Sequence, residues 1–256
     1  MTHRILTALA AATALTTAAH AQETPYYLKL SGGALYTGDS TNSGRAEAPF
    51  EPGLVDAVLV EGGAYRFETD FETGGFAGIA IGKTTPYGPF RSELELLGTT
   101  TDVARHGGFE TLGQDLDNAD LAVLLGQDTP TGTTIGTALA DARGSVETVS
   151  IMINFYHDLR AAGAIYPYWG AGIGPTWVNV SYDPSGTGFV DDDSIVFSWQ
   201  AMAGVAWELN NQHTIQVGSR YLGMQTVEVD TSAFLESELD VDVRQFLVEL
   251  GWRYRF

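Results

Sequence analysis

Acidic and basic side chains alternate with apolar ones in several segments of this 256-residue chain. Alternate residues of a β-strand point to the same face, so these charges share one face of each strand. If the faces meet in one enclosed space, the chemistry open to them is ion pairing, because an isolated buried charge is costly. The set forms either a polar filling or a gate for ions, and we expect the filling. Its members are Lys29, Arg91, Glu93, Glu95, Glu208, Arg220, Glu249, Arg253 and Arg255.

Histidines are poorly placed for catalysis. A nucleophile of the serine or aspartate type needs a histidine base beside it. His106 lies in a predicted loop, and His157 and His213 lie at predicted turns. Because His157 and Asp158 are adjacent, their side chains point to opposite faces of a strand. We therefore expect no catalytic residues and no enzyme, and a lipid-modifying hydrolase remains the third alternative.

Composition argues against metal, cofactor and nucleic-acid binding. The chain has 13 basic and 32 acidic residues, a net charge of −19, and nothing that resembles the basic face of a nucleic-acid-binding protein. Cysteine is absent, which removes thiolate metal sites. The run Asp191-Asp192-Asp193 could hold a divalent ion shared with lipopolysaccharide phosphates, but we expect solvated charge there. We predict no metal and no cofactor.

The N-terminus has the pattern of a secretory signal. Residues 1–21, MTHRILTALAAATALTTAAHA, combine His3 and Arg4 with a short apolar stretch and an Ala-His-Ala cleavage site. We expect residues 1–21 to be a signal peptide for Sec-type export, and residues 22–256 to form one domain. No later run is long and apolar enough for a transmembrane helix.

The elements that must position the charges are strands with a period of two residues. Their predicted ranges are 26–37, 74–84, 89–101, 146–157, 165–181, 194–208, 212–229 and 245–256. Long and short connections alternate strictly between them, as in a meander across a bilayer with short periplasmic turns and long external loops. Backbone groups in hydrocarbon must all be paired, so the strands must close. We predict an all-β fold, an eight-stranded antiparallel up-and-down transmembrane β-barrel, with residues 54–65 as the place where two further strands could lie.

Tryptophans mark the face that meets lipid. Trp169 and Trp177 are eight residues apart, and so are Trp199 and Trp207. At roughly 3.3 Å per residue, eight residues span about 26 Å of strand. A tilt near 40° reduces this to about 20 Å of height, close to the apolar band between two aromatic girdles. The apolar series then faces lipid and the charged series faces a lumen. Pro175 is expected at a bulge or a rim, because it cannot donate to the ladder.

The motifs PYWGAGIG, FRSELEL, GSRYL and the terminal GWRYRF carry a family resemblance. With them, residues 24–256 resemble the small OmpA/OmpX-like outer-membrane β-barrels of the porin-family or surface-antigen branch. The resemblance implies that Trp252, Tyr254 and Phe256 form a signal read by the barrel-assembly machinery. It also implies the outer membrane of a Gram-negative bacterium, with outer-membrane lipid and lipopolysaccharide as surroundings.

The predicted external connections hold most of the acid. Segments 38–73, 100–145, 182–193 and 227–240 contain eight, seven, four and five of the 32 acidic residues. This rim attracts cations and repels polyanions, and it offers a surface to an extracellular partner. Residues 121–125 could form a short helix there. The leading hypothesis is a structural or surface-interacting barrel with a charged, filled lumen, and the second is a small porin or narrow ion channel.

Overall fold

The computed structural model describes residues 26–45, 64–85, 88–111, 113–123, 129–140, 143–160, 163–183, 190–231 and 237–256. The predicted signal peptide and most of segment 54–65 lie outside these ranges. Within them the chain is almost entirely β-structure, and no helix there is long and apolar enough to cross a membrane.

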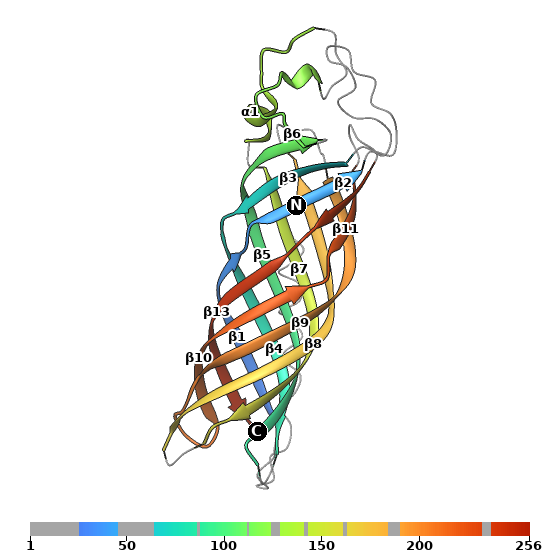
Figure 1. Ribbon diagram of the computed structural model, residues 1–256. Helices are drawn as coiled ribbons and strands as arrows, with labels where there is room; N and C mark the ends of the chain where they lie inside the picture. The colour runs from blue at the N-terminus through green and yellow to red at the C-terminus, as the bar shows by residue number, and fades with distance from the viewer. Residues whose placement is uncertain are drawn as a thin grey trace.

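Eight strands form a closed antiparallel ring (Figure 1). Each pairs with its sequence neighbour in the ring, and the last pairs with the first through Tyr27 and Arg255. The ring confirms the predicted eight-stranded up-and-down barrel. Its members are β1 (Tyr26–Thr37), β4 (Thr73–Thr84), β5 (Phe90–Thr111), β7 (Gly144–Asp158), β8 (Ile165–Tyr182), β9 (Val190–Glu208), β10 (His213–Met224) and β13 (Arg244–Arg255).

The strand alternation sorts side chains between the outside and the lumen. On β7, Ile151, Ile153 and Phe155 are exposed on the outer face, while Met152, Asn154 and Tyr156 are buried inside. An exposed apolar band of this size is unfavourable in water and favourable in hydrocarbon. Inward glycines leave room for large inward side chains: a Cβ on Gly218 would lie 2.6 Å from the Tyr168 hydroxyl oxygen.

The prediction of two long external loops is wrong in part, because strands extend into both segments. The first contains β2 (Ser40–Arg45) and β3 (Ala64–Phe71), and the second contains the end of β5, β6 (Gln114–Asp115), the 3-10 helix η2 (Leu121–Val123) and α1 (Ile135–Leu139). Two further strands continue this sheet: β11 (Val227–Thr231) pairs with β12 (Ser237–Val241), and β12 pairs with β2. The cylinder therefore continues beyond the apolar band, toward the end that carries β6 and α1 in Figure 1.

In this extension the apolar faces of the strands point inward and the polar faces point outward, the reverse of the spanning segments. The reversal explains why the sequence analysis predicted loops here. On β3, Tyr65 and Phe67 point inward, while Arg66 and Glu68 point outward. Outside the bilayer a strand must show water its polar face, so the pattern is that of a soluble sheet. The extra strands lengthen members of the ring and do not add to it. Among the described residues the ring therefore has eight strands and not ten.

Two apolar clusters lie in the lumen on the external side of the charged residues. The lower one, here called the apolar layer, consists of Leu35, Phe76, Leu97, Met152, Leu222 and Leu247. The upper one fills the extension and is rich in valine, with Val146, Val178, Val180, Val227 and Val241 all fully buried. The described lumen is thus charged at the periplasmic end, and toward the outside its two apolar clusters are separated by buried polar side chains such as Thr99, Thr148 and Gln245.

Pro175 lies within β8, and the expectation of a bulge or rim position is wrong. The pairing of β7 with β8 is interrupted near Pro175, but the register is the same on both sides, from Ser150–Thr176 to Ile153–Ile173. On the other edge Pro175 pairs with Phe197 of β9. The missing donor costs a ladder bond without displacing the strand.

Candidate functional site

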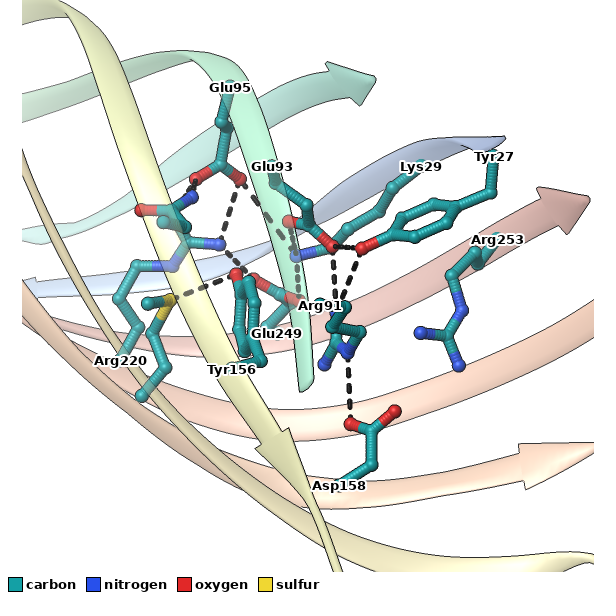
Figure 2. Close-up of polar contacts among 12 residues, drawn as sticks. Tyr27, Lys29, Arg91, Glu93, Glu95, Tyr156, Asp158, Arg220, Glu249 and Arg253 are labelled. Carbon is teal, nitrogen blue, oxygen red and sulfur yellow. Dashed lines mark hydrogen bonds and ion pairs between the residues drawn. The ribbon is translucent and has the colours of Figure 1, made fainter. Parts of the chain in front are cut away.

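The centre of the lumen holds an ion-pair network from four strands (Figure 2). Arg220 of β10 makes a bidentate contact with Glu95 of β5, with Nη1–Oε2 and Nη2–Oε1 distances of 2.8 and 3.0 Å. Arg220 also pairs with Glu249 of β13. Lys29 of β1 lies 2.9 Å from the other Glu249 oxygen, Oε1. The two cations and the two carboxylates are therefore paired with one another.

Neutral side chains complete this centre, and the sequence analysis did not identify them. Asn154 donates to Glu95 Oε2 at 2.8 Å, and Gln200 donates to Asn154 Oδ1 at 2.7 Å. Gln200 Oε1 in turn accepts from Arg220 Nη1 at 2.9 Å. Their inward position on the alternating strands was the signal that could have found them. Their bonds hold the Arg220–Glu95 pair in one geometry.

A second group lies nearer the periplasmic end and is built around Arg91. Its Nη1 lies 2.7 Å from Glu93 Oε1 and its Nε lies 2.9 Å from Asp158 Oδ1. The Tyr27 hydroxyl donates to the same Glu93 oxygen at 2.8 Å. The Arg91 guanidinium also sits 3.8 Å above the Tyr156 ring, a cation–π distance. Asp158 was considered only as a partner of His157, and the pairing of β5 with β7 brings it to Arg91 instead.

The remaining charged residues lie at the periplasmic mouth. Glu208 is 2.8 Å from Arg160 and 3.6 Å from Arg255, and all three are partly exposed. Arg253 is buried and donates to the Tyr166 hydroxyl at 2.7 Å. The structure therefore buries seven of the nine predicted residues and leaves Glu208 and Arg255 at the rim.

The predicted girdle residues lie on the outer face of the barrel. Trp169, Trp177, Trp199 and Trp207 are each between 38% and 55% exposed, with apolar neighbours such as Ile173 and Val205. The Trp177 indole donates to Asp193 Oδ2 at 2.7 Å, at the external edge of the apolar band. Asp193 is thus engaged by the girdle, and no group of residues that could hold a metal ion occurs in the described part of the chain.

The C-terminal aromatic residues form a continuous outer row. The ring centroids of Trp252 and Tyr254 are 6.0 Å apart, and those of Tyr254 and Phe256 are 5.6 Å apart. His213 accepts from the Trp252 indole at 3.2 Å. The row lies at the end of β13, next to the first described residues of β1.

The histidines lie apart from one another. His157 packs on the rings of Phe90 and Trp169, on the outer face, as His213 does on Trp252. His106 is buried in the extension, where its Nδ1 lies 2.8 Å from the Thr69 hydroxyl. Burial lowers the pKa of His106 to about 4, so the ring is neutral at pH 7.

The external end carries an ordered loop and an open hollow. Asp120 accepts from the backbone N–H groups of Ala122, Thr131 and Gly132, which lower its pKa to about 2. A hollow of about 550 Å³ lies between this loop and the side of the extension. Its polar lining includes Glu68, Asp70, Arg105, Asp117, Thr134 and Thr137.

A closed eight-stranded ring with an apolar outer band and a filled lumen defines an outer-membrane β-barrel. The chain belongs to the outer membrane protein beta-barrel domain family, whose model matches residues 7–254. The outer membrane protein OprG from Pseudomonas aeruginosa is similar in fold, with a TM-score of 0.53 and 11% identity over 91% of this chain and 98% of that one. Neisserial surface protein A is 12% identical over the same shares, with a TM-score of 0.47.

The curated relatives match a shorter stretch. An uncharacterized protein of Brucella abortus (strain 2308) is 37% identical over 91 residues, which cover 32% of this chain and 31% of that protein. An uncharacterized protein of Brucella melitensis biotype 1 matches to the same extent. The matched part is therefore about a third of the length of these relatives.

Proposed function

We propose that this protein is a non-enzymatic, non-conducting barrel that stabilises the outer membrane and presents its external extension to the surroundings. One observation carries the proposal: the apolar layer crosses the lumen directly above the charged network. Leu35, Leu97 and Leu247 in this layer are fully buried. An ion that passed it would lose part of its hydration among apolar side chains, which is costly. An eight-stranded barrel is also just wide enough for its side chains.

The extension supports the surface role. It carries a rigid sheet, the Asp120 loop and the polar hollow beyond the apolar band, where an extracellular partner or lipopolysaccharide could contact them. Export through the Sec route and recognition of Trp252, Tyr254 and Phe256 by the barrel-assembly machinery belong to the same proposal. The separation of His106, His157 and His213 supports the absence of catalysis, since their described neighbours are Thr69 and aromatic rings rather than a serine or aspartate nucleophile.

A narrow ion channel is the second candidate, and the ion-pair network favours it. If Arg220 exchanged partners, polar side chains could line a path as far as the apolar layer. That layer would still have to open. The test therefore changes residues of the apolar layer and leaves the charged residues as they are.

Planar-bilayer recording of the purified, refolded protein tests the proposal. We expect no stable openings of nanosiemens size from the wild type. The double variant Leu97→Ala/Leu247→Ala removes two side chains of the layer and should admit water, giving brief openings. Leu96→Ala is the matched control, because Leu96 faces lipid one residue away. Stable openings of the wild type would overturn the structural role and favour the channel.

A further inference from the structure

Four arginines gather at the periplasmic end of the lumen, here called the arginine vestibule: Arg91, Arg160, Arg253 and Arg255. Three carboxylates pair with them, Glu93, Asp158 and Glu208, and Glu93 also lies 3.8 Å from Lys29. The vestibule is thus locally cationic, although the whole chain has a net charge of −19. Like charges held close together in a low dielectric repel strongly unless a counter-charge joins them.

Two of these guanidinium groups have unused donors inside the barrel. Arg91 uses Nε and Nη1, while its buried Nη2 has no hydrogen-bond partner. Arg253 donates through Nη2 to Tyr166, while its buried Nη1 has none. Arg253 also makes no ion pair with any carboxylate in the described ranges. Both side chains are 2% exposed, so bulk water does not solvate these nitrogens freely.

Both groups border the same side chain, Tyr27. Arg91 Nη1 lies 3.5 Å from the Tyr27 hydroxyl, and the Arg253 guanidinium carbon lies 5.1 Å from the Tyr27 ring centroid. Figure 2 shows both guanidinium groups on the side of the Tyr27 ring where Asp158 lies. Two buried N–H donors of like charge beside one side chain have the chemistry of an anion site.

We propose that the arginine vestibule binds one small monovalent anion of the chloride class between Arg91 Nη2 and Arg253 Nη1. The anion enters from the periplasm, since the apolar layer closes the other end. A single-atom anion suits the site better than phosphate, because an eight-stranded barrel leaves little space among its inward side chains. Arg253, which has no carboxylate partner, gains the counter-charge that the other buried cations already have.

Stability in different anions tests the site in the folded, full-length protein. Unfolding by urea in detergent is followed at constant ionic strength while gluconate, which is too large to enter, is replaced by chloride or bromide. A bound anion lowers the unfolding equilibrium constant by the factor 1 + [anion]/Kd, about 10-fold at roughly nine times the Kd. Arg253→Met should lose this saturable response. Arg105→Met, which removes an exposed arginine of the extension, should keep it.

Crystals grown in bromide give a second, direct measurement. We expect an anomalous peak between the Arg91 and Arg253 guanidinium groups in the wild type and none in Arg253→Met. Equal responses of wild type and Arg253→Met to chloride would overturn the proposal, and so would a bromide structure of the wild type without the peak. If Arg253→Met does not fold, the wild-type bromide structure decides alone.

Discussion

Loss of Arg220 should destabilise the barrel far more than loss of a surface arginine. In the variant Arg220→Met, Glu95 loses its bidentate partner and Glu249 loses one of two cations. Lys29, whose Nζ lies 3.9 and 2.9 Å from Glu95 and Glu249, is then the remaining described cation beside both carboxylates. Breaking a buried pair in this way leaves an uncompensated carboxylate, which costs about 3–5 kcal/mol.

A second substitution should recover most of that loss. Glu95→Gln in the Arg220→Met background removes the orphaned charge. The new amide can still bond to Asn154 and Gln200, which contact Glu95 in the wild type. A buried pair replaced by neutral groups of similar size is often close to neutral in stability. We therefore expect a coupling energy of about 2–3 kcal/mol in the double-mutant cycle.

The assay is reversible urea unfolding in detergent, followed by tryptophan fluorescence and by gel migration before and after boiling. Arg105→Met is the control, because Arg105 pairs with Asp70 on the exposed face of the extension. Such surface pairs contribute at most about 1 kcal/mol. Additive effects of Arg220→Met and Glu95→Gln, or a loss at Arg220 no larger than that at Arg105, would refute the idea of a coupled buried network.

Two further predictions concern the outer face and the extension. Ile151→Arg, in the middle of the lipid-facing band, should cost about 2–4 kcal/mol in lipid vesicles, whereas Thr100→Arg at the external edge should cost about 0–1 kcal/mol; equal costs would contradict the assigned apolar band. The pKa of His106 is about 4 in the folded protein against 6.5 as its ordinary value, so the folded state prefers the neutral ring. The contribution of His106 to the free energy of unfolding is complete above pH 6.5 and is lost as the pH falls toward 4, by at most about 3 kcal/mol. In His106→Leu the free energy of unfolding should therefore depend less on pH between 6.5 and 4.

The sequence analysis succeeded wherever a period of two residues carries the information. Alternation assigned Trp169 to lipid and Arg220 to the lumen, and the exposure of Trp169 and the burial of Arg220 agree with these assignments. The spacing of Trp169 and Trp177 likewise indicated a bilayer rather than a soluble core. These conclusions hold because a strand that crosses hydrocarbon must show it an apolar face and must pair all of its backbone groups.

Segments outside the bilayer were harder to read. Tyr65 and Phe67 alternate with polar residues in the same way as the spanning strands do, but with the apolar face turned inward. Alternation does not state which face is the inner one. Without the position of the membrane edge, this part of the chain read as loop, and the cylinder above the apolar band was missed.

The sequence by itself determined the class of fold, the eight spanning strands and which of their residues face inward. Only the tertiary structure decided which inward residues meet: Arg220 with Glu95, Arg91 with Asp158, and Arg253 with no carboxylate in the described ranges. The physical reason is that contacts across a lumen depend on how each strand is staggered against the next and on how the last closes against the first. That stagger is set by all eight pairings together, and no single segment contains it.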